Sequence, residues 1–372
     1  MHVAWSLLPR QGASGLQRMR ASFRPPNAGR NGTGPTLKAW LPYLRAGSGV
    51  DIFTRRMARA LGRLGVSVHV QAFPQALQNM PWLLAAVPPP PGVDLVLANS
   101  WHGFAFARPG IALVTVNHLC VADPALAPYR NRHQAFFHRR LVTAFEARSY
   151  RAAAAVVAVS DYTAEQVRRH CPELEVITVA NGVDTDFLRP GDADGGDRAD
   201  GLDLLFVGNL SRRKGADLLP RIMRRLGPRY RLFYASLRAG ERLPPAPNLH
   251  PLGCLDESRL RDAYRRADLV LFPTRLEGLP YVVLEGMACG KPVVASRVAS
   301  LPELIAHNET GVLCPIDDVD AFASAVERLQ RDPERRRKIG IAARRTIVAR
   351  FPESLMAERY PRLFETVLAQ RP

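Results

Sequence analysis

The sequence lacks the cysteine patterns that define disulfide-rich domains and structural zinc sites. Five cysteines are scattered over 372 residues, their number is odd, and no CxxC pair occurs. This argues against a disulfide framework or a zinc site and is typical of a reducing compartment. Long apolar runs are also lacking, since no stretch approaches the ~18 apolar residues of a membrane-spanning helix. Any contact with a membrane is therefore expected to be peripheral.

Lysine is scarce, and the strong positive charge comes from arginine. Only four of the 51 basic residues are lysines, and the formal net charge is +17. Residues 1–150 hold 17 basic and 4 acidic side chains, a balance of +13. A surface of this charge attracts anions. We therefore expect the first part of the chain to face an anionic membrane surface or a phosphorylated acceptor.

The first 35 residues differ from the rest of the chain. They contain five arginines and no acidic residue, and they lack the apolar segment of a secretory signal. We interpret 1–35 as a basic, poorly ordered extension, or as the product of a start codon assigned too far upstream.

From residue 37 onward, short apolar runs alternate with segments of helical periodicity. This order predicts an α/β fold with parallel sheets. Strands are expected at 37–43, 66–73, 93–98, 111–116, 154–159, 176–179, 204–207, 230–234, 269–272, 292–295 and 311–314. Helices are expected at 50–64 and 134–152, among others.

A polar, glycine-rich stretch at 191–201 interrupts this order and is typical of a linker. We therefore predict one domain over 36–190, a second over 202–351, and a last helix over 352–372. In parallel α/β sheets, ligands bind beyond the carboxyl ends of the strands. A ligand site is expected between the two domains.

The most informative segment contains two glutamates, Glu277 and Glu285. Glu277 lies in a turn, whereas Glu285 lies within an apolar helix, where an unsatisfied carboxylate is costly. Pro280 and Gly290 fit the start and the end of that helix. Glu285 could accept both hydroxyls of a ribose or form a salt bridge to an arginine. Glu277 could hold a sugar hydroxyl or simply complement the helix dipole.

A basic loop, Gly208–Gly215, follows an expected strand and contains Asn209, Arg212, Arg213 and Lys214. Its backbone N–H groups and cations could bind a diphosphate. The alternative is an exposed basic connection with no ligand.

Two further features lie where the expected strands of the first domain end. Gly49 belongs to a glycine turn that opens a helix, and His118 follows another strand. Either could serve a ligand or be structural.

The pairs Asp184/Asp186 and Asp192/Asp194 are read as turn residues and not as metal ligands.

Arginine and aromatic residues alternate over 129–151. This pattern is typical of an amphipathic helix lying on anionic lipid, but it also fits an ordinary helix with its aromatic side chains in the core. The candidate membrane or acceptor face consists of Arg130, Arg132, Phe136, Phe137, Arg139 and Arg140.

Together these motifs resemble family-4 retaining glycosyltransferases of the GT-B fold. The resemblance covers nearly all of 36–370, and the two glutamates followed by Gly290–Ala295 are its most specific part. It implies two Rossmann-like β/α/β domains facing a central cleft, with a C-terminal helix that crosses back to the first domain. It also implies a nucleotide-sugar donor, retention of configuration, and no metal or other cofactor.

Carried over to the matching positions, the resemblance implies catalytic roles for His118, Glu277 and Lys214. It implies that the donor is bound by Gly49, Asn209, Arg212, Arg213, Lys214, Gly278, Leu279, Pro280, Tyr281 and Glu285. The chain departs from the family at Asn209, where an arginine is common, and at Ala299-Ser300, where two glycines are common. Either Arg212 or Arg213 could supply the missing charge.

The predicted function is hexose transfer to a lipopolysaccharide, capsule, exopolysaccharide or lipid-linked glycan, at the inner face of the cytoplasmic membrane. The alternative is a soluble glycosyltransferase acting on a small sugar or a storage polymer. A nucleic-acid-binding protein, suggested by the pI of about 10.5, is the weakest hypothesis because no known reading motif is present.

Overall fold

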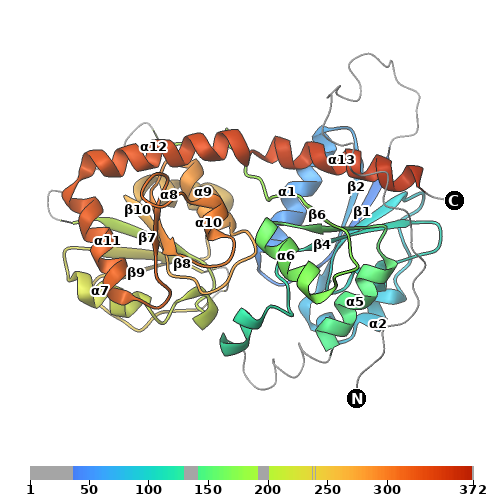
Figure 1. The fold of residues 1–372 in the computed structure, drawn as a ribbon, viewed down its shortest axis with the longest axis horizontal. Helices are drawn as coiled ribbons and strands as arrows, with labels where there is room; N and C mark the ends of the chain where they lie inside the picture. The colour runs from blue at the N-terminus through green and yellow to red at the C-terminus, as the bar shows by residue number, and fades with distance from the viewer. Residues whose placement is uncertain (1–36, 130–140, 192–200, 237, 239, 371–372) are drawn as a thin grey trace, which may run out of the picture. The chain divides into compact units, whose positions relative to one another are not determined.

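Two parallel β-sheets form the framework of the protein (Figure 1). The structure is a computed structural model that describes residues 37–129, 141–191, 201–236, 238 and 240–370. The predictions for 1–35, for the arginines and phenylalanines of 130–140 and for most of the linker lie outside the described residues. Both sheets belong to one unit, Thr36–Pro372.

The first sheet has the strand order β2-β1-β3-β4-β5-β6, and every described pairing in it is parallel. Its strands are β1 (Lys38–Arg45), β2 (Ser67–Pro74), β3 (Leu95–Asn99), β4 (Ala112–Asn117), β5 (Ala155–Ala158) and β6 (Val176–Thr178). Its helices are α1 (Gly49–Arg63), α2 (Pro81–Ala85), α3 (Gly103–Phe106), α5 (Thr143–Ala152) and α6 (Asp161–His170), with 3-10 turns η2 (Gln75–Asn79) and η3 (Pro124–Tyr129).

The second sheet has the order β12-β11-β10-β7-β8-β9 and is also parallel in its described pairings. Its strands are β7 (Asp203–Val207), β8 (Arg231–Ala235), β9 (Leu249–Gly253), β10 (Leu269–Phe272), β11 (Val293–Ser296) and β12 (Val312–Cys314). The helical elements that follow these strands are η5 (Arg212–Lys214), α7 (Leu219–Leu226), α8 (Glu257–Arg266), α9 (Tyr281–Ala288), α10 (Leu301–Leu304), α11 (Val319–Arg331), α12 (Pro333–Arg350) and α13 (Glu353–Ala369).

The central strands explain why the sheets are parallel. Every residue of β4 and β10 is buried, so both faces of these strands are covered, as in sheets with helices on each side. The predicted α/β fold with two such sheets is confirmed. The sequence prediction omitted β9, an edge strand in which Pro251 interrupts the apolar pattern. Proline is tolerated there because an edge strand leaves some backbone N–H groups unpaired.

The last two helices connect the two sheets. Figure 1 shows α12 beside the second sheet and α13 beside α1; contacts between α12 and α9 and between α13 and α1 agree with this view. Tyr360 of α13 is fully buried, and its ring centre lies 6.2 Å from that of Phe53 in α1. The predicted C-terminal helix that crosses back to the first domain is therefore confirmed.

The packing of α12 against α9 depends on Gly340. A Cβ atom at this position would lie 2.2 Å from the carbonyl oxygen of Gly290, so Gly340→Ala should lower the free energy of unfolding by about 1–3 kcal/mol. Gly62 in α1 provides the matched control, because a Cβ there meets nothing within 4 Å. Gly62→Ala should raise stability by about 0.4–1 kcal/mol. Urea unfolding of both variants checks this, and equal effects would contradict the packing argument.

Candidate functional site

The loops that follow β7 and β10 meet at the carboxyl edge of the second sheet. The first contains the predicted basic loop, in which the Ser211 side chain accepts a hydrogen bond from the Lys214 backbone N–H. Gly215 ends this turn with φ 71°, and an added Cβ would lie 1.9 Å from the carbonyl oxygen of Pro273. Only glycine allows the two loops to approach this closely.

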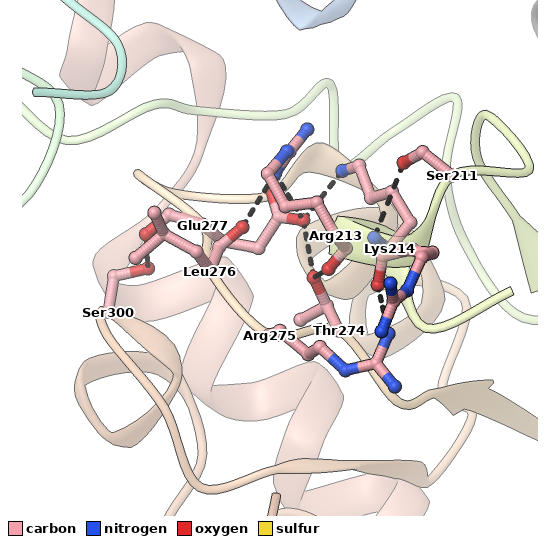
Figure 2. Close-up of polar contacts among 9 residues, drawn as sticks. Ser211, Arg213, Lys214, Thr274, Arg275, Leu276, Glu277 and Ser300 are labelled. Carbon is pink, nitrogen blue, oxygen red and sulfur yellow. Dashed lines mark hydrogen bonds and ion pairs between the residues drawn. The ribbon is translucent and has the colours of Figure 1, made fainter. Parts of the chain in front are cut away.

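Glu277 is the centre of this junction (Figure 2). Its Oε1 atom lies 2.7 Å from Lys214 Nζ and 3.3 Å from Arg213 Nη1, and it accepts a 2.8 Å hydrogen bond from Thr274 Oγ1. The Glu277 side chain is 8% exposed and that of Lys214 is 15% exposed. The structure thus brings together Glu277, Lys214 and Arg213, all of which the sequence predicted as site residues.

Burial and charge act in opposite directions on this cluster. Burial alone would raise the pKa of Glu277, but Lys214 and Arg213 offset this effect, and the pKa is lowered. Burial lowers the pKa of Lys214, while Glu277 opposes that effect. Glu277 is therefore a carboxylate at neutral pH, and two cations share it. With all three groups ionised, the cluster has an excess of one positive charge, which suits an anionic ligand.

Backbone hydrogen bonds hold the two loops together. The Arg275 N–H donates to the Arg213 carbonyl oxygen over 2.8 Å, and Arg213 Nη1 donates to the Leu276 carbonyl oxygen over 2.6 Å. The Thr274 hydroxyl oxygen, which donates its proton to Glu277, also lies 3.2 Å from the Arg213 carbonyl oxygen. Sequence reasoning missed Thr274, whose only signal is its position three residues before Glu277.

Glu285 has different partners. Its Oε1 atom lies 2.7 Å from Arg56 Nη2, and its Oε2 accepts a 2.9 Å hydrogen bond from the Tyr264 hydroxyl. Arg56 comes from α1, and its guanidinium also lies 4.7 Å from the centre of the Tyr281 ring. Of the two alternatives for Glu285, the salt bridge is the arrangement seen in this structure. Its contact with a ribose stays a prediction.

The turn after Glu277 reaches the first sheet at His118. A Cβ on Gly278 would lie 1.8 Å from the His118 carbonyl oxygen, so the two backbones are in direct contact. The His118 ring packs edge-on against Phe53, with ring centres 4.6 Å apart. Burial lowers the pKa of His118 to about 4, so its imidazole is neutral near pH 7 and can accept a hydrogen bond.

The other predicted donor residues surround this junction in different ways. Asn181 Nδ2 donates to the Leu279 carbonyl oxygen over 2.9 Å, and Pro280 precedes the first residue of α9. Arg212 is exposed, and a Cβ on Gly49 would meet nothing within 4 Å. The buried Oδ1 atom of Asn209 has no hydrogen-bond partner among the described residues. No observation assigns a ligand role to these residues.

Ala299 and Ser300 are the positions where the resemblance led us to expect glycines. Ala299 keeps a positive φ of 50°, a conformation that costs of order 1–3 kcal/mol for a residue with a side chain. The Ser300 hydroxyl donates to the Glu277 carbonyl oxygen over 3.5 Å, a contact that is drawn in Figure 2. The departure from glycine therefore adds a polar contact beside Glu277.

Sequence reasoning also missed a buried polar cluster that includes Asn117, the residue before His118. Glu146 of α5 accepts hydrogen bonds from Ser100 Oγ over 2.9 Å and from Asn117 Nδ2 over 3.1 Å. The Tyr150 hydroxyl lies 3.3 Å from the same oxygen. Glu146 thus links the ends of β3 and β4, directly before His118. Phe145 and Tyr150 of α5 are buried, as in the ordinary-helix interpretation of this segment.

Two family models match the chain. The first, described as glycosyl transferases group 1, matches residues 201–332, and the second, described as glycosyltransferase family 4, matches residues 71–187. Together with two parallel sheets and a crossing helix, these matches define the GT-B class of glycosyltransferases. The chain belongs to glycosyltransferase family 4.

Curated relatives match part of the chain. An alpha-maltose-1-phosphate synthase from Mycolicibacterium smegmatis is 31% identical over 59% of this chain and 64% of its own length. A D-inositol 3-phosphate glycosyltransferase from Mycobacteroides abscessus is 36% identical over 40% of this chain and 37% of its own length. The chain therefore aligns with less than two thirds of either relative.

Solved structures share the fold at lower identity. A sucrose-phosphate synthase from Thermosynechococcus elongatus has a TM-score of 0.77 at 19% identity, covering 90% of this chain and all of that one. HepE from Anabaena, solved in complex with UDP-glucose, has a TM-score of 0.69 at 17% identity, covering 89% of this chain and all of that one.

The buried Glu146 predicts a specific pH dependence. Burial raises its pKa from 4.5 to about 7, although hydrogen bonds from Ser100, Tyr150 and Asn117 oppose this. The stability that depends on its neutral form is fully present below pH 4.5 and is lost as the pH rises to about 7. Over this pH interval, the free energy of unfolding of Glu146→Gln should therefore rise by roughly 1–3 kcal/mol relative to that of wild type.

Urea unfolding at a series of pH values measures this difference. Glu165→Gln, which changes an exposed glutamate of α6, is the control and should follow the wild-type pH dependence. If Glu146→Gln also runs parallel to wild type, Glu146 does not titrate as described.

Proposed function

We propose that this protein is a glycosyltransferase that transfers a sugar from a nucleotide-sugar donor to a small sugar or sugar phosphate. In this reaction the bond between the anomeric carbon and the donor diphosphate breaks. A new bond forms to an acceptor hydroxyl oxygen, and the hydroxyl proton and the nucleoside diphosphate leave. The family resemblance favours retention of the anomeric configuration.

The buried cluster of Glu277, Lys214 and Arg213 is the observation that carries this proposal. Two cations share one carboxylate, so part of their hydrogen-bonding capacity remains for an anion. Positive charge at this position would stabilise the negative charge that grows on the leaving diphosphate. Glu277 would then hold these cations in place and contact the donor sugar, while Glu285 would reach the ribose after separating from Arg56.

The relatives support a small acceptor better than a polymer. Their names specify maltose 1-phosphate and inositol 3-phosphate as product or acceptor, which agrees with the alternative and not with the lipopolysaccharide or capsule prediction. The +13 charge of residues 1–150 suits a phosphorylated sugar as well as an anionic membrane. Because of the relatives' names, we propose a phosphorylated sugar as the first candidate acceptor. Contact of the chain with an anionic membrane through 130–140 stays the second candidate. None of the described helices is both long and apolar enough to span a membrane.

Nucleotide binding tests the donor site directly. Titration calorimetry with UDP, GDP and ADP should identify at least one nucleoside diphosphate that binds the wild-type protein. Lys214→Met should weaken that affinity by roughly ten- to a hundred-fold, because a hydrogen bond to a charged group contributes about 1.5–3 kcal/mol.

The matched control is Lys338→Met on α12. Lys338 Nζ lies 2.6 Å from Glu334, but both side chains are exposed. This variant should bind the nucleotide like wild type. Equal affinities for Lys214→Met and wild type would refute the assignment of Lys214 to the diphosphate.

We also propose that the donor diphosphate binds without a metal ion, because Lys214 and Arg213 would supply the positive charge. The nucleoside diphosphate identified above should have the same affinity in excess EDTA and in excess magnesium. Binding that disappears in EDTA and returns with magnesium would show that a cation belongs to this site.

A further inference from the structure

Arg275 lies beside the Glu277 cluster, and its side chain has no role in the site described so far. Although its side chain is 4% exposed, every part of its guanidinium has a partner. Nη1 and Nη2 lie 2.6 and 2.9 Å from the two carboxylate oxygens of Asp217, and Nε lies 2.5 Å from Asp317 Oδ1. Nη1 also donates to the Arg212 carbonyl oxygen.

These partners come from two different loops, and Arg275 itself belongs to a third. Asp217 and Arg212 belong to the segment after β7, and Asp317 follows β12. Arg275 itself follows β10 and lies two residues before Glu277. A single planar side chain therefore joins the loops at the carboxyl ends of three strands, one of which contains Lys214 and Arg213.

The charge of Arg275 is not available to a ligand. Two carboxylates surround it, and hydrogen bonding to Asp217 raises its pKa above the ordinary value. Partial burial opposes the effect on Asp217, but the hydrogen bonds from Arg275 keep the pKa of that carboxyl below its usual range. Arg275 and Asp217 are therefore ionised at neutral pH, and the guanidinium of Arg275 is already paired with two acidic side chains. Arg275 can therefore act through geometry but not by attracting a diphosphate.

A tyrosine from the first sheet covers this guanidinium. The Arg275 Cζ atom lies 5.5 Å from the ring centre of Tyr129, at the end of η3, and η3 contacts η5. A cation over an aromatic face is a favourable contact. The loop containing Lys214 therefore contacts both Arg275 and the 3-10 turn η3.

We propose that Arg275 is a positioning residue that fixes the loop 211–217, so that Lys214 and Arg213 point toward Glu277 and the donor diphosphate. The planar fork of arginine makes the bidentate contact with Asp217 possible, and a lysine cannot reproduce it. The part of the proposal that concerns the loop stands on geometry alone, whereas the part that concerns the diphosphate rests on the proposed function.

Backbone hydrogen exchange tests the loop without any ligand. Within 211–217, the N–H groups of Lys214, Gly215 and Ala216 donate to carbonyl oxygens of the same turn. In Arg275→Ala their exchange should accelerate by roughly ten-fold or more, because a lost charge-assisted contact lets this segment open locally. Arg275→Lys should show the same acceleration. In Arg275→Ala, low concentrations of guanidinium chloride should slow the hydrogen exchange of these N–H groups again.

Arg231→Ala is the matched control. Arg231 makes a similar two-bonded contact with Asp203 in the same sheet, at 2.7 and 2.5 Å, away from Glu277. Its loss should leave exchange in 211–217 unchanged. Asp217 and Asp317 are 39% and 50% exposed, so water can solvate them once Arg275 is removed, and the variant should remain folded. If the alanine variant does not fold, the lysine variant provides the measurement.

Unchanged exchange in 211–217, or equal acceleration in Arg231→Ala, would overturn the positioning role. The affinity of the nucleoside diphosphate that binds wild type, among UDP, GDP and ADP, provides the second measurement. Arg275→Ala should weaken this affinity by roughly ten-fold, because Lys214 becomes disordered. Arg231→Ala should bind the nucleotide as wild type does. Unchanged binding in Arg275→Ala would overturn the link to the diphosphate. If wild type binds none of the three while exchange responds as expected, the positioning role stands and the proposed donor site fails.

Discussion

The arrangement of the candidate site depends on one buried carboxylate. Glu277 is removed from water, and its charge persists because Lys214 and Arg213 lie against the same oxygen. Leaving one buried charge of such a group unpaired would cost several kcal/mol. This constraint requires the loops after β7 and β10 to meet, and Gly215 makes that approach possible. The same ion cluster therefore fixes the local fold and, under the proposed function, would supply cations for an anionic ligand.

Contacts between the two sheets lie beside this cluster. Gly278 touches the His118 backbone, and the Arg56–Glu285 ion pair joins α1 to α9. Gly278, His118 and Glu285 were predicted to bind a ligand, whereas Arg56 was not. In this structure Arg56 satisfies Glu285. Under the proposed function, a donor that contacts Glu285 would compete with Arg56, and donor binding would then be coupled to the contacts between the sheets.

Much of the fold could be predicted from the sequence because its signals are local. Apolar runs mark the buried strands, and Pro280 and Gly290 closely bracket α9. Glu277, Lys214 and Arg213 were also predictable, since a basic turn and a turn glutamate each follow an expected strand. The remaining contacts depend on residues far apart in the sequence. Arg56 pairs with a residue 229 positions away, and no local pattern distinguishes it from neighbouring arginines.

A crystal structure of the protein with a bound nucleoside diphosphate tests the central claim most directly. We predict that the phosphates lie within hydrogen-bond distance of Lys214 or Arg213, with Glu277 still bound to one of these cations. A nucleotide bound elsewhere, with the cluster of Glu277, Lys214 and Arg213 unchanged and without phosphate contacts, would contradict the assignment of this cluster to the donor.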